Sequence, residues 1–175
     1  MENPYFSVII PTYNRSAFCV EAIDSILNQT FTEFEVIVCD DGSTDDTKKQ
    51  VLACRDPRVK YFKQDNQGVS VARNLGVSKS KGRFICYLDS DDLWGRTKLE
   101  ETHAFSLEHP ELEVLFHDFC KHDIRRQAPY NATNTELFPQ LFKYFTPITT
   151  DRLSWKSTTP ECFKNVLEGY PFYPS

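Results

Sequence analysis

Short apolar segments alternate with helical patterns through residue 120, and this alternation restricts the fold more than any other feature of the chain. The segments expected to form strands are residues 6–10, 35–39, 59–62, 84–88 and 114–119. Apolar residues recur at helical spacing in the segments between them. Strands and helices that alternate in this way build a doubly wound, mostly parallel sheet with helices on both faces. We therefore predict the α/β class with this architecture.

Local signals place the ends of several elements. Pro11 is expected to end the first strand, because proline lacks the N–H that a strand donates. Ser16 is expected to cap the first helix, and Ser43 or Thr44 the second. Asp45 would then lie in the first turn of the second helix, where an acidic side chain is favourable. The third and fourth helices are expected at residues 69–78 and 96–109.

The alternating pattern weakens from about Asp123. A short amphipathic helix is indicated by four apolar residues, namely Leu137, Leu141, Phe142 and Phe145. A further helix is indicated at residues 162–167. We therefore expect an α/β domain over residues 1–122 and a separate region over residues 123–175.

Composition and charge exclude several classes of protein. With 40% hydrophobic and 14% aromatic residues the chain is expected to fold, and a net charge of −5 argues against nucleic-acid binding. No apolar stretch approaches the roughly 18 residues that span a bilayer, and no secretory signal is expected. The six cysteines form no Cys-x-x-Cys pair, which indicates reduced thiols in a cytoplasmic protein. Peripheral association with the inner face of the plasma membrane stays open.

Polar motifs follow three of the expected strands. They are Pro11, Thr12, Tyr13 and Asn14 after the first, Asp40 and Asp41 after the second, and Asp89, Ser90, Asp91 and Asp92 after the fourth. Ligands of open parallel sheets bind outside the carboxyl ends of the strands. The convergence of three such ends predicts a single binding site.

Three carboxylates within four residues concentrate negative charge at one strand end, which costs free energy unless a cation compensates it. Asp89 and Asp91 are two residues apart and would face the same side of an extended segment, and Asp92 could lend a further oxygen. Oxygen ligands suit Mg²⁺ or Mn²⁺ rather than Zn²⁺. We predict that Asp89 and Asp91 bind such an ion, which would also hold a diphosphate. The alternative is an acidic turn that caps the following helix.

Each of the other candidate residues also has two interpretations. Asp40 or Asp41 could accept a hydrogen bond from a nucleotide base, or could form a turn before the next helix, and both roles can coexist. Tyr13 either stacks on a base or packs at the strand end. Arg73 either reaches a diphosphate, whose oxygens suit its planar fork, or is an exposed helical arginine.

Four motifs in this order resemble the family 2 glycosyltransferases, which have the GT-A fold and take a sugar from a nucleotide-diphosphate donor. The motifs lie at residues 6–15, 36–45, 66–76 and 87–92. The resemblance implies that Thr12, Tyr13 and Asp41 or Asp40 hold the nucleoside, usually uridine. It further implies that Asp89 contacts the ribose or the metal and that Asp91 is the principal metal ligand.

The expected nucleotide-binding residues are Pro11, Thr12, Tyr13, Asn14, Asp40, Asp41, Arg73, Asp89 and Ser90, and the expected ligands of Mn²⁺ or Mg²⁺ are Asp89 and Asp91. The resemblance implies a metal-dependent, inverting transfer from a UDP-sugar to a glycan or lipid-linked acceptor. A nucleotidyltransferase is disfavoured, because it would need a Gly-rich, basic loop after the first strand.

The chain departs from the family pattern beyond Asp123. Family members carry an acidic pair in that region, which supplies the base that activates the acceptor. The acids present here are isolated, namely Glu136, Asp151, Glu161 and Glu168. We therefore expect a complete donor-binding domain at residues 1–122 and an incomplete acceptor-side region at residues 123–175, without the base. A donor-binding module with no transferase activity is the alternative function.

Overall fold

The computed structural model describes residues 3–111 in full and, beyond them, the backbone of five short strands between residues 116 and 157. The chain forms two compact units, Met1–Leu107 and Glu108–Ser175, and each is described by itself. The predicted boundary at residue 122 separates donor and acceptor functions and stays a prediction.

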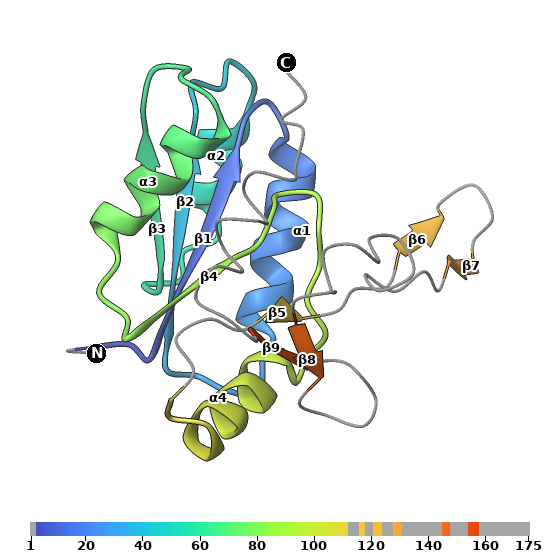
Figure 1. Cartoon of the computed structure of the whole chain (residues 1–175). Coiled ribbons are helices and arrows are strands. Elements are labelled where there is room, and N and C mark those ends of the chain that lie inside the picture. The colour runs from blue at the N-terminus through green and yellow to red at the C-terminus, as the bar shows by residue number, and fades with distance from the viewer. Residues whose placement is uncertain are drawn as a thin grey trace. The chain divides into compact units, whose positions relative to one another are not determined.

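The first unit is built on a four-stranded, all-parallel sheet (Figure 1). Its strands lie in the order β3-β2-β1-β4 and are β1 (Phe6–Thr12), β2 (Phe34–Asp40), β3 (Val59–Lys63) and β4 (Phe84–Tyr87). The helices are α1 (Ser16–Leu27), α2 (Thr47–Ala53), α3 (Val69–Lys79) and α4 (Lys98–Glu108). The predicted α/β fold with a doubly wound parallel sheet is confirmed.

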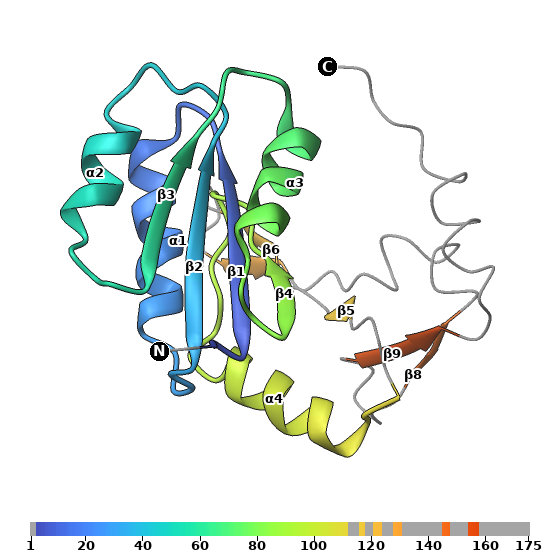
Figure 2. The ribbon, with the colours of Figure 1, turned by 90° about the vertical axis from the view of Figure 1, so that its left-hand side faces the viewer.

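The two central strands are buried along their whole length, so alternate residues pack on opposite faces. On one face Val8 and Ile10 of β1 join Ile23 of α1 in a large apolar cluster. On the other face Ile9 of β1 packs with Ala72 of α3. Figure 2 shows the result, with α1 and α2 on one side of the sheet and α3 on the other.

Pro11 does not end the first strand, contrary to the prediction, because β1 continues to Thr12. The pairing of β1 with β4 stops at Ile9 and Tyr87, whereas the pairing with β2 continues to Thr12 and Asp40. The carbonyl of Ile9 accepts from Leu88 on the β4 side. Pro11, two residues further on, faces that same side beyond the end of the ladder, so its missing N–H removes no hydrogen bond.

The helix caps also differ from the predicted ones. Ser16 is the first residue of α1 rather than its cap, and α2 begins only at Thr47. The Asp45 carboxylate accepts from the Ser16 N–H (3.1 Å) and from the Thr47 N–H (3.0 Å), so one side chain serves the first turns of two helices. Burial alone would raise the pKa of Asp45, but its hydrogen bonds to Thr47 and Ser16 outweigh this and lower it.

The second unit contains antiparallel pairs. One sheet has the order β5-β9-β8, with β5 (Phe116–His117), β8 (Phe145–Pro147) and β9 (Ser154–Ser157), and β6 (Lys121–Asp123) pairs with β7 (Ala128–Tyr130). The predicted fifth strand therefore does not extend the parallel sheet. Phe145, predicted as helical, begins β8, where Pro147 would oppose a helix. The rest of that predicted helix and residues 162–167 lie outside the described residues.

The four cysteines in the described part of the chain are free, as predicted, namely Cys19, Cys39, Cys54 and Cys86. Burial raises the pKa of the Cys39 thiol to about 12, so this side chain stays a neutral thiol in the apolar core.

A buried carboxylate joins three elements near the amino ends of the strands. Glu35 of β2 accepts from Ser7 Oγ (2.6 Å), from Lys60 Nζ (2.5 Å) and from the Lys81 N–H (2.7 Å). Ser7 Oγ in turn accepts from the Gly82 N–H (2.8 Å). Burial alone would raise the pKa of Glu35, but these donors outweigh it and lower the pKa.

Gly76 of α3 permits the close approach of this helix to β1. A Cβ atom at Gly76 would lie 2.4 Å from Cγ2 of Ile9, which is fully buried. We expect Gly76→Ala to lower the free energy of unfolding by about 1–3 kcal/mol, because overpacking outweighs the gain in helix propensity. Urea unfolding checks this. Gly95→Ala, where a Cβ would meet nothing within 4 Å, should be neutral, and equal stability of the two variants would contradict the prediction.

The lowered pKa of Glu35 links stability to pH. A carboxyl group whose folded pKa lies below its unfolded value stabilises the fold above the unfolded pKa, and this contribution is lost as the pH falls through the folded pKa. We expect wild-type stability to decline in acid below about pH 4 more steeply than that of Glu35→Gln. Urea unfolding between pH 3 and pH 7 measures both slopes, and parallel profiles would show that Glu35 makes no such contribution.

Candidate functional site

Four loops follow the carboxyl ends of the four parallel strands and therefore lie at one edge of the sheet. They connect β1 to α1, β2 to α2, β3 to α3 and β4 to α4. All the predicted site residues lie at strand ends or in these loops except Arg73, which belongs to α3. Contacts between the loops, rather than within them, define the arrangement.

Asn14 ties the first loop to the second. Its backbone has a left-handed conformation (φ 51°), which asparagine tolerates better than most residues. Its N–H donates to Ser43 Oγ (2.8 Å), and its Oδ1 accepts from the N–H groups of Thr44 (2.8 Å) and Asp45 (3.3 Å). The side chain predicted to bind nucleotide thus holds two loops together.

Asp40 is fully buried at the end of β2. Its Oδ1 accepts from the Ser43 N–H (2.7 Å), and its Oδ2 accepts a short hydrogen bond from the Tyr61 hydroxyl. Burial, followed by the Asp40 contact, raises the pKa of Tyr61. The bond to Ser43 closes a turn before α2, which is the structural role considered for this residue.

Asp41 ties the second loop to the third. Its Oδ1 accepts from Gln64 Nε2 (2.7 Å) and from the Gln67 N–H (2.9 Å), and its Oδ2 accepts from the Gly68 N–H (2.8 Å). Gly68 has a positive φ of 91°, which favours glycine, immediately before α3. Gln64 was not among the predicted site residues, and its one signal in the sequence is its place directly after β3.

Thr12 and Tyr13 differ in exposure. Thr12 is buried, and in the described part of the chain its Oγ1 is the one buried side-chain oxygen or nitrogen without an oxygen or nitrogen partner; the Cys19 sulfur lies beside it. Tyr13 is 48% exposed. The Tyr13 ring is therefore open to solvent and available for stacking, the first of the two roles considered for it.

The fourth loop carries the acidic motif. Asp89 and Asp91 have side chains 48% exposed, whereas Ser90 between them is buried. The segment is not extended, contrary to the prediction, but forms a turn that the Asp92 N–H closes by donating to the Asp89 carbonyl (3.0 Å). Burial raises the pKa of Asp92, and the neighbouring charges of Asp91 and Asp89 raise it further. The three carboxylates therefore do concentrate negative charge.

Two arginines lie against the acidic motif. Arg73 Nη2 donates to Asp89 Oδ1 (2.7 Å), and Arg15 Nη1 donates to Asp91 Oδ2. Arg73 thus lies at the motif, and its contact with a diphosphate stays a prediction. Arg15 was not among the predicted residues, although it directly follows Asn14.

The donor set is compatible with a hard divalent cation. Among the described residues no group of three His, Cys, Asp or Glu side chains is arranged to hold a metal ion. Asp89 and Asp91 could supply two carboxylate ligands, and the remaining coordination positions would then be open to phosphate oxygens and water. Oxygen-only ligands fit Mg²⁺ or Mn²⁺.

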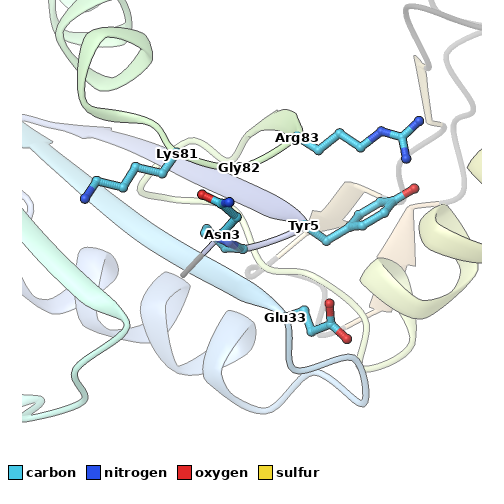
Figure 3. Close-up of a pocket in the computed structure, with 7 residues that line it drawn as sticks. Asn3, Tyr5, Glu33, Lys81, Gly82 and Arg83 are labelled. Atoms are coloured by element: carbon cyan, nitrogen blue, oxygen red, sulfur yellow. The ribbon is translucent and has the colours of Figure 1, made fainter. Parts of the chain in front are cut away.

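A surface hollow of about 390 Å³ lies away from these loops, before the strands rather than after them (Figure 3). Its lining residues are Asn3, Pro4, Tyr5, Glu33, Lys81, Gly82 and Arg83. Because these residues precede β1, β2 and β4, the hollow is at the amino edge of the sheet and is separate from the candidate site.

The model of the family described as "Glycosyl transferase family 2" matches residues 7–167. The chain belongs to the family 2 glycosyltransferases. Among curated relatives, an uncharacterised glycosyltransferase of Rickettsia conorii is 42% identical over 144 residues, which are 78% of this chain and 23% of that protein. The UDP-Glc:α-D-GlcNAc-diphosphoundecaprenol β-1,3-glucosyltransferase WfgD of Escherichia coli is 41% identical over 101 residues, 57% of this chain and 40% of that protein. The chain thus spans less than half the length of either relative.

Solved structures are also similar to this chain. TarS of S. aureus in complex with UDP-GlcNAc has 37% sequence identity and a TM-score of 0.58, over 60% of this chain and 32% of that chain. The mannosyltransferase PcManGT of Pyrobaculum calidifontis, in complex with GDP-Man and Mn²⁺, has 25% identity and a TM-score of 0.58, over 89% and 45%. The predicted GT-A fold is confirmed. No helix in the described part of the chain is long and apolar enough to cross a membrane.

The contacts of Asp41 yield a prediction about stability. Asp41→Asn replaces one acceptor oxygen with an NH₂ group that faces backbone donors, so we expect the free energy of unfolding to fall by about 1–3 kcal/mol in the absence of any nucleotide. Urea unfolding checks this. Asp65→Asn removes the same charge from an exposed position of the third loop and should be neutral. Unchanged stability of Asp41→Asn would mean that Asp41 does not hold this loop.

Proposed function

We propose that this chain forms the donor-binding part of a glycosyltransferase that moves a sugar from a UDP-sugar to a glycan or lipid-linked acceptor with the help of Mn²⁺ or Mg²⁺. The observation that carries the proposal is the pairing of carboxylates and guanidinium groups at the end of β4. Carboxylates suit a divalent cation and guanidinium groups suit a diphosphate, so both kinds of partner for a nucleotide-sugar donor lie at one edge of the sheet. The relatives named for UDP-linked sugars and lipid-linked acceptors support this choice of substrates.

The nucleoside would bind at the first three loops. The exposed ring of Tyr13 offers a stacking face, and Thr12, buried at the end of β1 directly before it, would line the site. Asp40 and Asp41 already accept two and three hydrogen bonds, respectively. Since a carboxylate has about four lone-pair sites, Asp41, which is 5% exposed, could accept a further bond from a base, whereas the fully buried Asp40 would hold the turn beside it. Pro11, Asn14 and Ser90 would then shape the site rather than contact the nucleotide through side-chain donors.

The diphosphate would bind at the fourth loop. Asp91, with Asp89, would hold the cation, which when bound neutralises charge on the leaving diphosphate. Arg73, placed at Asp89, would donate to phosphate oxygens through the fork of its guanidinium group. Asp89 would accept from the ribose or bind the cation.

The transfer would invert the anomeric centre, with a carboxylate base at the acceptor hydroxyl. No described residue is assigned that role. Because the chain spans less than half the length of the relatives compared, a second candidate function is donor binding without transfer by this chain alone.

Calorimetric titration with UDP, GDP and dTDP, first with Mn²⁺ and then with EDTA, tests the donor site. We expect UDP to bind more tightly than GDP or dTDP in Mn²⁺, and to bind at least about tenfold more weakly in EDTA or in Asp91→Ala, because a charge-assisted contact is lost. Asp24→Ala, on α1 about 12 Å along the helix from Ser16, removes the same charge and should bind UDP as the wild type does. Tight binding of UDP by Asp91→Ala in Mn²⁺ would refute the site.

Hydrolysis of a UDP-sugar separates the two candidate functions. Release of sugar by the wild type, lost in Asp91→Ala, would support a chain that catalyses by itself. Binding of UDP with no release of sugar would favour a donor-binding module.

A further inference from the structure

We propose that Arg15 couples the binding of the cation to the binding of the donor. Its guanidinium group forms an ion pair with the Asp91 carboxylate when no cation is present, and moves to the diphosphate when the donor and the cation bind together. This inference rests on the proposed function. It adds a residue that neither the sequence motifs nor the comparisons assign. It also predicts an order, in which the cation alone binds poorly and the donor makes its binding favourable.

The ion pair connects two loops that are distant in sequence. Arg15 ends the first loop, and Asp91 lies in the fourth, 76 residues further on. Through Asn14 the same first loop is fixed to the second loop. The backbone of Arg15 is therefore held in place, whereas its side chain, 48% exposed, is free to change rotamer.

Arg15 contacts Asp91, the proposed principal metal ligand. Arg15 Nη1 donates to Asp91 Oδ2, so a cation that binds this oxygen must displace the guanidinium group. The contact made by Arg15 is to one carboxylate oxygen, which leaves most of its five donors for another acceptor. Phosphate oxygens are acceptors that guanidinium groups bind well, and they would arrive at the same edge of the sheet.

The charges explain why the cation and the donor should bind together. The charges of Asp89 and Asp91 act on the neighbouring Asp92. Two guanidinium groups lie at this cluster of three carboxylates, that of Arg15 on Asp91 and that of Arg73 on Asp89. With all five groups ionised, the cluster has a net charge of about −1. A divalent cation bound alone would change this net charge to about +1. A diphosphate supplies the missing negative charge and an alternative partner for each arginine.

The strength of the ion pair sets the size of the effect. Exposed ion pairs contribute little to stability, so Arg15 competes with a cation only weakly. Its removal should tighten binding of Mn²⁺ alone by about 2–5-fold. The loss of a guanidinium–phosphate contact should at the same time weaken UDP binding in Mn²⁺ by about tenfold. The factor by which UDP raises the affinity for Mn²⁺ must then fall. By linkage, Mn²⁺ raises the affinity for UDP by the same factor.

The test measures Mn²⁺ binding directly, through the EPR signal of the free ion, with and without saturating UDP. The proteins are the wild type, Arg15→Ala, Arg15→Gln and Arg96→Ala. Arg96 is an exposed arginine of the fourth loop that, in the described structure, forms no ion pair with Asp89 or Asp91, so its variant controls for the loss of one positive charge. Arg15→Gln keeps a long polar side chain, in case alanine disturbs the start of α1.

We expect both Arg15 variants to bind Mn²⁺ alone more tightly than the wild type and Arg96→Ala, and to gain less Mn²⁺ affinity from UDP. If the wild type binds UDP with Mn²⁺ while the Arg15 variants bind Mn²⁺ alone no more tightly than Arg96→Ala, the inference is wrong and the proposed function stands. If the wild type binds neither UDP nor Mn²⁺, the proposed function fails and this inference fails with it.

Discussion

The burial of β1 and β2 on both faces is the constraint on which the rest of the structure depends. All seven residues of each strand are buried, so helices must cover the sheet on both sides. The connections between parallel strands then cross over the faces and place every strand-to-helix loop at the same edge. The candidate site occupies that edge because the core leaves the loops no other place.

Carboxylates organise this edge before any ligand is considered. Asp45 serves the first turns of α1 and α2, Asp40 closes the turn after β2, and Asp41 holds the loop before α3. Each accepts from backbone N–H groups that would otherwise lack partners in loops or first helical turns. These acidic residues at the end of β2 and in the second loop therefore have a structural role of their own, and substitutions there act on folding whether or not a nucleotide also binds them.

The strands and helices of the first unit were predictable from the sequence because their signals are local. Apolar runs and helical periodicity marked β1 to β4 and α1 to α4 to within a few residues. Signals that depend on neighbours were missed: Pro11 is tolerated within β1 because β4 has already ended beside it. Asp45 acts as a cap for α1 across 29 residues of chain, which no local pattern reveals. Pairing of β5 with β9 is equally non-local, so the strand at residue 116 was assigned to the wrong sheet.

The site was predictable as a set of residue types but not as a set of contacts. The acidic motif implied a need for positive charge, and a cation bound between carboxylates and diphosphate was the partner inferred from the sequence. The structure instead supplies guanidinium groups, one on each of Asp89 and Asp91. Under the proposed function, each arginine would neutralise its carboxylate until a metal ion binds there, and would then become a ligand of the phosphate oxygens. Such a site would keep its charge close to balance both with and without the donor, which a cluster of carboxylates alone would not achieve.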